Sequence, residues 1–296
     1  MNKILLIGAT GFLGSKIRIH YEVNGAEVIT MGRSVSSDIR VDFDCINIDS
    51  LNLSRYSFDT IIHCAAINET QITKSIYDTY LINVTLTRLL TELAVKCSVH
   101  NFIYISTFHV YGMTNGNLSE VSDTNPLNDY GLTHYLSEKI VENICSQNNI
   151  NYIIVRPTNI YGLPENINEF NRWSLVPFLF VKQAIEKASI SLTSSGEQLR
   201  NFVSVEDVIR RFDYLGKESV VNAYGTDTLS IYEFANKVAN KALEVVGKQV
   251  KVNRIISPGV SASKKSLKIV NTFETSEANK TQLDNYLTEM FLRLRK

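Results

Sequence analysis

Short apolar runs alternate with amphipathic stretches through the first half of the chain, and this alternation restricts the fold most strongly. The runs are apolar throughout, which is typical of strands buried on both faces. Their alternation with helix-length stretches indicates a parallel sheet covered by helices. We predict an α/β fold with strands at 3–8, 27–32, 60–66, 101–107 and 151–157, and helices at 12–24, 75–97 and 130–147.

The pattern becomes less regular after about residue 160. There we expect a loop at 161–173, helices at 174–188, 230–247 and 278–296, and a strand followed by a loop within 252–266. With 296 residues and 44% hydrophobic content, the chain can form one large core and a smaller lobe. We predict a larger domain at 1–160 plus about 200–222, and a smaller C-terminal α/β lobe at about 161–199 plus 223–296.

The charge balance and the apolar segments exclude several kinds of partner. Thirty basic and thirty acidic residues cancel, so we expect neither nucleic acid nor a membrane surface as a partner. No apolar run reaches the roughly 20 residues of a membrane span, and the first run is too short for a signal peptide. The four cysteines lack CxxC spacing, so we expect no metal site, no disulfide and a cytoplasmic location.

Three glycines stand between the first predicted strand and the first predicted helix, in "LLIGATGFLGSKI". Gly8 permits a tight turn, Gly11 lets the backbone approach a pyrophosphate, and Gly14 lets helix and strand pack closely. Phosphates would lie at the helix N-terminus, where unpaired N–H groups point at them. The pattern predicts a dinucleotide-binding loop.

The end of the second predicted strand indicates which dinucleotide is bound. A carboxylate there would bind the free ribose diol of NAD, but "TMGRSVSS" contains no acid. Arg33 and Ser34 could hold a 2′-phosphate, because the planar fork of arginine suits phosphate. A solvated surface arginine is the alternative for Arg33. We expect NADP(H) rather than NAD.

Two tyrosines in "PLNDYGLTHYLSEKIVENIC" are candidates for a catalytic acid or base. Tyr130 has His134 four residues later, and Tyr135 has Lys139 at the same spacing. A neighbouring cation lowers the pKa of a phenol, which is near 10 when unperturbed. The two tyrosines are about 140° apart on a helix, so both cannot face one site.

Several stretches follow one another in an order that a known family shares: "GATGFLG" (8–14), "HCAA" (63–66), "LINVTLT" around Asn83, "YISTFHVYG" (104–112), "PLNDYGLTHYLSE" (126–138), "VRPTNIYG" (155–162) and "RNFVSVEDV" (200–208). In these stretches the chain resembles the extended short-chain dehydrogenase/reductases that act on nucleotide-diphosphate sugars, which include epimerases, dehydratases and 4-keto-reductases. The resemblance implies a Rossmann-type doubly wound parallel sheet in an NADP-binding domain, with substrate bound by the smaller lobe.

The family pattern P-x-x-x-Y-G-x-S-K-x-x-x-E favours Tyr130 over Tyr135. It runs from Pro126 through Tyr130 to Glu138, and it puts His134 where the family has lysine. By resemblance, Tyr130 exchanges a proton with a sugar hydroxyl or keto oxygen while hydride passes to or from the nicotinamide.

The histidine at position 134 changes the expected chemistry. His134 could donate a hydrogen bond to the nicotinamide ribose, but it carries a full charge only below about pH 6.5 if unperturbed. The pKa of Tyr130 would then be lowered less than in the family. Ketone reduction needs a protonated tyrosine as acid, so the substitution favours reduction.

The resemblance implies further roles. Thr107 would bind the same substrate oxygen as Tyr130, His109 could touch substrate, and Asn83 would brace the site. His63 and His109 lack carboxylates at metal-ligand spacing, which favours a structural interpretation for both. The implied cofactor-binding residues are Gly8, Thr10, Gly11, Phe12, Leu13, Gly14, Arg33, Ser34, Ala65, Ala66, Asn83, Tyr130, His134 and Pro157.

Two later residues are implied to bind the nucleotide sugar. Asn159 matches a position that contacts this substrate, and Arg200 matches an arginine near the diphosphate, where its bidentate donors suit an anion. A surface salt bridge is the alternative for Arg200. Trp173, Phe178 and Phe180 could stack on a base, but core packing is favoured for each.

We therefore expect NADP(H)-dependent reduction of a nucleotide-diphosphate-linked 4-keto-6-deoxysugar, in the synthesis of a surface-polysaccharide sugar. The alternatives are a nucleotide-sugar epimerase or dehydratase with retained NAD(P), and a catalytically weakened nucleotide-binding homologue. By analogy with the family, we expect a homodimer formed through the helices at 75–97 and 130–147.

Overall fold

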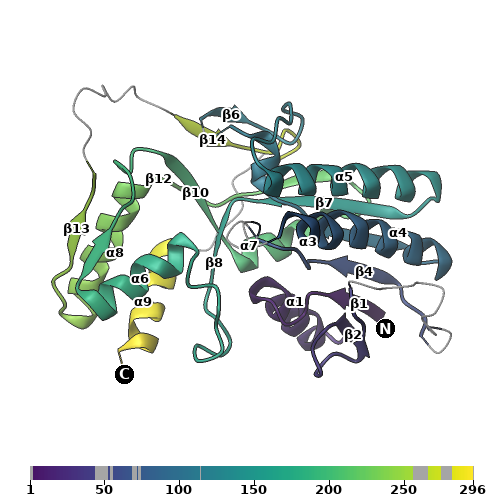
Figure 1. Ribbon diagram of the computed structural model, residues 1–296, viewed down its shortest axis with the longest axis horizontal. Coiled ribbons are helices and arrows are strands. Elements are labelled where there is room, and N and C mark those ends of the chain that lie inside the picture. The colour runs from purple at the N-terminus through teal and green to yellow at the C-terminus, as the bar shows by residue number, and fades with distance from the viewer. Residues whose placement is uncertain are drawn as a thin grey trace. The chain divides into compact units, whose positions relative to one another are not determined.

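The computed structural model describes residues 3–43, 53, 56–68, 72, 75–113, 115–255, 266–274 and 282–295 (Figure 1). The chain divides into two compact units. The first comprises Met1–Gly112, Asp123–Pro157 and Ile209–Val221, and the second comprises Met113–Ser122, Thr158–Val208 and Asn222–Lys296.

The first unit is built on a parallel sheet, which confirms the predicted fold class. Seven described strands have the order β11-β7-β5-β4-β1-β2-β3, so the order reverses between β1 and β4. A reversal of this kind is where open α/β sheets bind ligands. The strands are β1 (Lys3–Ile7), β2 (Glu27–Gly32), β3 (Ile39–Arg40), β4 (Thr60–His63), β5 (Asn101–Ile105), β7 (Asn151–Pro157) and β11 (Val220–Ala223), the last of which ends within the second unit.

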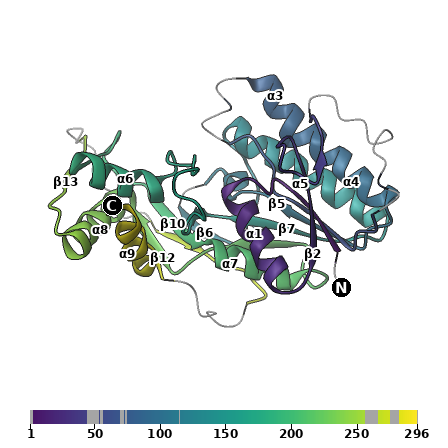
Figure 2. The same cartoon turned by 90° about the horizontal axis from the view of Figure 1, so that it is seen from below.

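Helices cover both faces of this sheet (Figure 2). On one side lies α1 (Phe12–Val23), and on the other lie α3 (Ile76–Tyr80), the π-helical turn η2 (Leu81–Thr85), α4 (Leu86–Lys96) and α5 (Asp129–Gln147). The predicted helix at 75–97 therefore contains a π-helical turn. The Asn128 side chain caps α5 by accepting from the Gly131 N–H at 2.9 Å. The described part of the unit also contains two short 3-10 helices, η3 (Phe108–Tyr111) and η4 (Arg211–Tyr214).

Alternate strand residues form the core against α4 and α5. Leu5, Ile61 and Phe102 are fully buried and pack in one cluster with Leu90 of α4 and Val141 of α5. Burying each such side chain contributes about 1.5–3 kcal/mol. The intervening strand residues are buried as well, which explains why the strand sequences are apolar throughout.

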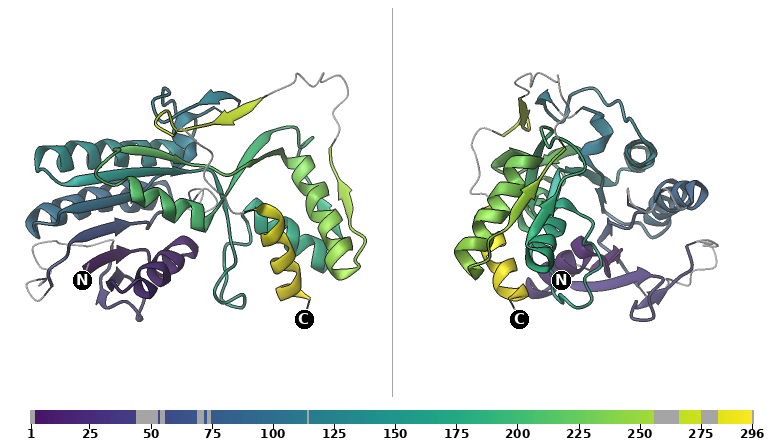
Figure 3. Two further views of the ribbon diagram at one scale, coloured as in Figure 1. Left: turned by 180° about the vertical axis from the view of Figure 1, so that it is seen from behind. Right: turned by 60° about the vertical axis from the view of Figure 1, so that its left-hand side comes forward.

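Among its described residues, the second unit contains small sheets and three longer helices. A three-stranded sheet has the order β12-β10-β8, and two further pairs are β13 with β9 and β14 with β6. The helices α6, α8 and α9 pack together (Figure 3). The element bounds are β6 (Gly116–Leu118), β8 (Asn159–Tyr161), α6 (Val176–Lys187), β9 (Ser189–Ser191), β10 (Leu199–Ser204), α7 (Val205–Arg210), β12 (Asp227–Ser230), α8 (Ile231–Val246), β13 (Lys251–Asn253), β14 (Leu267–Ile269) and α9 (Leu283–Leu294).

The units differ from the predicted division mainly in two segments, since residues 113–122 and 200–208 group with the second unit. The first of these segments contains β6, whose partner is β14, and Gly116 is aligned with Leu267. The second contains most of β10, which pairs with β8 and β12. Pairing between segments so distant in sequence leaves no local signal.

Several expectations fall partly outside the described residues. Parts of 252–266 and 278–296 are not described, although β13 and α9 lie within or beside them. Cys64, Cys97 and Cys145 are free thiols, and Cys45 lies outside the described residues. Across the described part of the chain, every helix is too short or too polar to cross a bilayer.

Candidate active site

The glycine loop leaves no room for side chains. Gly8 has a φ of +92° and follows β1 directly; a Cβ there would lie 2.8 Å from the Ala65 nitrogen. A Cβ on Gly14 would lie 2.1 Å from the Gly8 oxygen. Gly11 donates to that same oxygen at 3.0 Å and precedes α1 as its N-cap. The loop therefore holds the N-terminus of α1 against the ends of β1 and β4.

The predicted first-unit residues meet at one edge of the sheet. Parallel strands end together at their carboxyl side, and the residues that follow them line one crevice. Gly8 follows β1, Arg33 follows β2, Ala65 lies just beyond β4, and Thr107 lies just beyond β5. Pro157 is the last residue of β7. Five residues that the sequence predicted to lie near the cofactor therefore lie at the carboxyl edge of the sheet.

Asn83 braces this edge from the π-helical turn. Its side chain is buried and accepts from the Ile67 N–H at 2.7 Å. It also donates to the Ile67 oxygen at 3.2 Å and to the Thr133 hydroxyl at 3.1 Å. The backbone oxygen of Asn83 accepts from Ser137 of α5 at 2.6 Å. One asparagine therefore ties the loop after β4 to α5.

Tyr130 and His134 lie against each other on α5. Their rings meet edge to face with centroids 4.7 Å apart, and Tyr130 meets His109 in the same way at 5.5 Å. Thr107 is buried, and its hydroxyl oxygen accepts from the His109 N–H at 3.3 Å. That bond leaves the hydroxyl hydrogen of Thr107 available as a donor. A proton donor and a second hydroxyl therefore come from neighbouring elements.

His134 is buried and held by a tyrosine that sequence reasoning overlooked. Its Nδ1 lies 2.8 Å from the Tyr104 hydroxyl on β5. Among the described residues, its Nε2 has no hydrogen-bond partner. Burial lowers the pKa of His134 from 6.5 to about 3, with smaller contributions from His63 and His109. His134 is consequently neutral near pH 7 and supplies no positive charge to Tyr130.

His63 occupies a similar buried position on β4. Its Nε2 lies 3.0 Å from the Thr87 hydroxyl oxygen, and that hydroxyl donates to the Asn83 oxygen at 2.7 Å. Burial lowers the pKa of His63 to about 3. These contacts agree with the structural interpretation of His63.

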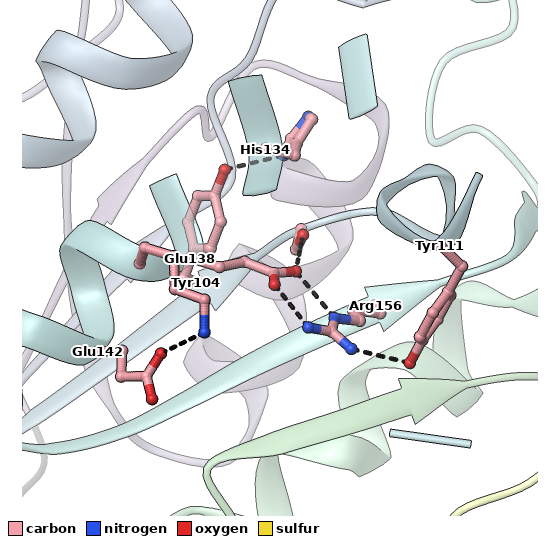
Figure 4. A network of polar contacts seen from close by, with 8 residues as sticks. Tyr104, Tyr111, His134, Glu138, Glu142 and Arg156 are labelled. Atoms are coloured by element: carbon pink, nitrogen blue, oxygen red, sulfur yellow. Dashed lines mark hydrogen bonds and ion pairs between the residues drawn. The ribbon is translucent and has the colours of Figure 1, made fainter. Parts of the chain in front are cut away.

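A buried ion pair lies farther along the same face of α5 (Figure 4). Arg156 of β7 contacts both carboxylate oxygens of Glu138, at 2.9 and 2.7 Å, and donates to the Tyr111 hydroxyl at 2.9 Å. Ser106 donates to the same carboxylate. Burial alone would lower the pKa of Arg156, but the bonded Glu138 carboxylate raises it. The network fixes the residue that precedes Thr107.

Sequence reasoning assigned no role to Glu138 or Arg156. One signal was present, because Arg156 ends an apolar run and Glu138 lies eight residues after Tyr130, on the same side of the helix. Charges at buried positions must be paired. The identity of the partner, however, depends on the packing of α5 against β7.

The alternative pair, Tyr135 and Lys139, lies on the opposite side of α5. The Lys139 side chain is 53% exposed and binds Glu142 at 2.8 Å. Its ammonium lies 5.7 Å from the Tyr135 ring centroid. The hydrogen bond to Glu142 raises the pKa of Lys139. This pair is on the solvent side of the helix.

The loop after β2 is open and polar. Arg33 is exposed, and the Ser34 hydroxyl lies 2.8 Å from the Ser36 hydroxyl. Asp38 is the first acid after β2, and it turns back to accept from the Thr30 N–H at 2.8 Å and from the Thr30 hydroxyl at 2.7 Å. These bonds lower the pKa of Asp38. The first acid of this loop is therefore hydrogen-bonded to Thr30 of β2.

The two substrate candidates lie in the second unit. Asn159 of β8 donates to the Asn201 oxygen at 2.9 Å, and Arg200 of β10 donates to the Leu199 oxygen at 3.1 Å. Since β8 and β10 pair in parallel, both residues lie in one small sheet. Phe178 and Phe180 are buried, as core packing predicts, and Trp173 is half-buried with Lys182 5.2 Å from its ring centroid.

Two observations of this structure fit a bound dinucleotide. The glycine loop is a cradle that a Cβ at Gly8 or Gly14 would fill, and it lies at a helix N-terminus. The buried Nε2 of His134 is a polar atom without a partner among the described residues. Gly8, Gly11 and Gly14 would hold the pyrophosphate, and His134 would meet the nicotinamide end.

Comparison with known proteins agrees with this geometry. The sequence model of the NAD dependent epimerase/dehydratase family matches residues 4–225. The chain therefore belongs to the NAD dependent epimerase/dehydratase family and is an NAD(P)-dependent enzyme of that family.

Two of the relatives are named for reactions of dTDP-linked sugars. The chain is 26% identical over 262 residues to a dTDP-4-dehydro-6-deoxy-D-allose reductase of a Streptomyces species, which covers 79% of each chain. It is also 26% identical over 278 residues to a dTDP-D-glucose 4,6-dehydratase of Dictyostelium discoideum. That match covers 81% of this chain but only 62% of the relative.

Solved structures share the fold. A UDP-glucuronic acid 4-epimerase from Bacillus cereus, in complex with UDP-glucuronic acid and NAD, has a TM-score of 0.80 at 22% identity and covers 99% of each chain. MoeE5 in complex with UDP-glucose and NAD has a TM-score of 0.77 at 21% identity, again over 99% of each chain. These likenesses establish the fold of this chain.

Proposed function

We propose that this enzyme reduces a nucleotide-diphosphate-linked 4-keto-6-deoxysugar with NADPH, in the synthesis of a surface-polysaccharide sugar. The observation that carries the proposal is the neutral His134 beside Tyr130, at 4.7 Å between ring centroids. Without a neighbouring ammonium, the pKa of a phenol stays closer to its unperturbed value near 10. Tyr130 is then suited to act as an acid, as ketone reduction requires.

The proposed chemistry assigns a task to each hydroxyl. Bound NADPH would supply hydride to the carbonyl carbon. The Tyr130 phenol gives its proton to the keto oxygen, which becomes the product hydroxyl. The Thr107 hydroxyl donates a hydrogen bond to the same oxygen and stabilises the charge that develops there. Asn159 and Arg200 are the proposed contacts to the nucleotide sugar.

Relatives support the substrate class. The Streptomyces relative carries the name of a reductase of a dTDP-linked 4-keto-6-deoxysugar and matches over 79% of its own length. A second such reductase, from Streptomyces bikiniensis, is 25% identical over 283 residues. Epimerases and dehydratases are also present among the relatives, so a neighbouring reaction of the same substrate class is the second candidate.

The decisive assay mixes the enzyme and NADPH with a dTDP- or UDP-linked 4-keto-6-deoxyhexose. Steady loss of NADPH absorbance with formation of the 4-hydroxy sugar supports the proposal. A changed sugar without net loss of cofactor overturns it in favour of an epimerase or dehydratase. Cofactor binding without turnover, unaltered in Tyr130→Phe, overturns it in favour of a nucleotide-binding protein.

The preference for NADP rests on the loop after β2. Arg33 is exposed there, and the first acid, Asp38, is bonded to Thr30. Removing one charge-assisted contact costs about 1.5–3 kcal/mol, so Arg33→Ala should raise the dissociation constant for NADPH about 10- to 100-fold and leave that for NADH unchanged. Equal losses for both cofactors would contradict a 2′-phosphate contact.

We further propose a homodimer that uses helices of the first unit. Exposed apolar side chains are present on α3 and α5: Ile76 is 51% exposed, Tyr77 72%, and Leu132 and Leu136 36% each. A second copy would cover such side chains. Light scattering during size-exclusion chromatography should give twice the chain mass, and Leu136→Glu should lower it to one chain.

A further inference from the structure

The Tyr104–His134 contact lies in a buried part of the first unit, and the proposed chemistry gives Tyr104 no role. Both side chains are 2% exposed, and the Tyr104 oxygen lies 2.8 Å from Nδ1 of His134 (Figure 4). The other ring nitrogen, Nε2, is buried without a partner among the described residues. Since the two nitrogens of an imidazole point in diverging directions, Nε2 faces away from Tyr104.

The direction of the Tyr104–His134 hydrogen bond determines what Nε2 can do. A neutral imidazole has one N–H and one bare nitrogen. If Tyr104 donates to Nδ1, the ring hydrogen is on Nε2, and His134 presents a donor. If Nδ1 donates to Tyr104, Nε2 presents only a lone pair.

The surroundings of Tyr104 favour donation by the phenol. Burial raises the pKa of Tyr104 well above its ordinary value, so the phenol keeps its proton. The nearby Thr87 and Ser137 hydroxyls both donate to the Asn83 oxygen, at 2.7 and 2.6 Å. Neither hydroxyl hydrogen is therefore directed at the phenol. Among the described residues, Nδ1 of His134 is the hydrogen-bond contact found for the phenol, at 2.8 Å, and its lone pair can accept the phenol hydrogen.

We propose that Tyr104 is a positioning residue that locks His134 in the Nε2–H tautomer. His134 then offers one neutral donor to a hydroxyl of the nicotinamide ribose. The inference rests on the proposed function only in that it needs a bound nicotinamide cofactor. The Nε2–H tautomer explains how a histidine can bind the ribose at a position where the family has lysine. Compared with lysine, the neutral ring keeps a hydrogen-bond donor in a fixed direction but lacks the positive charge.

The groups around His134 also account for its behaviour with pH. The rings of Tyr104 on β5 and Tyr130 on α5 contact the ring of His134. His63 of β4 and His109 of η3 act on His134 electrostatically, and Glu138 acts electrostatically on Tyr104. Burial lowers the pKa of His134 to about 3, so the ring takes up no second proton near pH 7. The donor at Nε2 is therefore constant across the physiological range.

The direct test is nitrogen NMR of the full chain labelled with ¹⁵N-histidine, with and without NADPH and without any sugar. His134 is assigned by comparison with His134→Gln. We expect a one-bond proton coupling on Nε2 and a bare, pyridine-type Nδ1 between pH 6 and pH 8. A proton on Nδ1, or a doubly protonated ring, would overturn the proposal whether or not Tyr104→Phe folds.

Cofactor binding gives a second, independent readout. Without the Tyr104 hydroxyl, in Tyr104→Phe, the His134 ring should be able to adopt both neutral tautomers, so that Nδ1 carries the proton part of the time. The dissociation constant for NADPH should rise about 3- to 10-fold, the worth of one neutral hydrogen bond. The matched control is Tyr152→Phe, the same deletion on β7 outside this network, which should change neither quantity.

These outcomes separate the inference from the proposed reaction. An unchanged tautomer and an unchanged dissociation constant in Tyr104→Phe would refute the positioning role. Absence of ketone reduction, with the NMR and binding results as expected, would refute the proposed function and leave the role of Tyr104 intact.

Discussion

Each of the two sides of α5 carries a tyrosine followed four residues later by a basic residue, yet the two pairs differ in burial and in charge. On the inner side, Tyr130, His134 and Glu138 follow one another at intervals of four residues, and the last two are 2% and 1% exposed. On the outer side, Tyr135 and Lys139 lie toward solvent, and Lys139 pairs with Glu142. The inner side has the unusual base, a neutral imidazole, while the outer side has the ordinary ammonium.

The spacing of a tyrosine and a base on a helix therefore does not by itself define a site. The outer pair has the better local chemistry for lowering the pKa of a phenol, but it lies on the solvent side of the helix. The inner pair, Tyr130 and His134, lies at the carboxyl edge of the sheet, where Thr107 and the glycine loop also lie. Position relative to the sheet decides which tyrosine can act.

The largest expected difference in stability concerns the charges on the two sides. Glu138→Gln leaves the buried Arg156 guanidinium without its counter-charge, and such a loss costs about 3–5 kcal/mol. The free energy of unfolding in urea should fall by that amount. Glu92→Gln is the matched control, because Glu92 forms an exposed pair with Arg88 on α4; its effect should stay within about 0.5 kcal/mol. Equal losses of unfolding free energy in Glu138→Gln and Glu92→Gln would mean that the buried pair contributes no more to stability than the exposed pair.

The pH dependence of stability should distinguish the inner base from the outer one. The pKa of His134 and of His63 is about 3 in the folded chain and 6.5 when unperturbed. Below pH 6.5 the unfolded chain binds protons that the folded chain excludes, so stability falls as pH falls from 6.5 toward 3. Each histidine contributes a slope of up to about 1.4 kcal/mol per pH unit.

The measurement is the unfolding free energy in urea at several pH values between 7 and 5. His134→Gln should remove one of the two contributions and flatten the curve relative to wild type. Lys139→Gln should leave the slope unchanged. Parallel curves for wild type and His134→Gln would show that His134 titrates normally in the folded chain.

The smallest expected effect is that of removing Lys139, the base on the outer side of α5. Lys139→Ala removes an exposed pair with Glu142 three residues away, which is worth about 0.3–0.5 kcal/mol. The dissociation constant for NADPH, followed by fluorescence titration, should stay within about twofold of wild type. A tenfold weakening of cofactor binding would place Lys139 at the ribose and reverse the comparison.

Much of the first unit could be predicted from sequence because its signals are local. Apolar runs specify the buried strands, and the three glycines lie where strand and helix must approach. Gly8 lies close to Ala65, and Asn83 accepts from the Ile67 N–H, while the roles of these residues in cofactor binding stay predictions. The family pattern was needed to choose Tyr130, since spacing alone left two pairs.

The rest of the fold and of the candidate site depends on contacts between segments that are distant in sequence. The strand β6 pairs with β14 across most of the second half of the chain, and neither has a strong pattern of its own. The network of Glu138, Arg156 and Tyr111 joins three elements that only the folded chain brings together. The burial of His134, and with it the loss of charge, likewise follows from packing rather than from spacing.

The most direct test of the account is single-turnover oxidation of NADPH by the keto-sugar nucleotide in two matched variants, Tyr130→Phe and Tyr135→Phe. Each loses one hydroxyl from the same helix. The account predicts that Tyr130→Phe slows the reaction about 10²- to 10⁴-fold, as expected for loss of a general acid, while Tyr135→Phe stays within about twofold of wild type. A slow Tyr135→Phe variant beside an active Tyr130→Phe variant would contradict it.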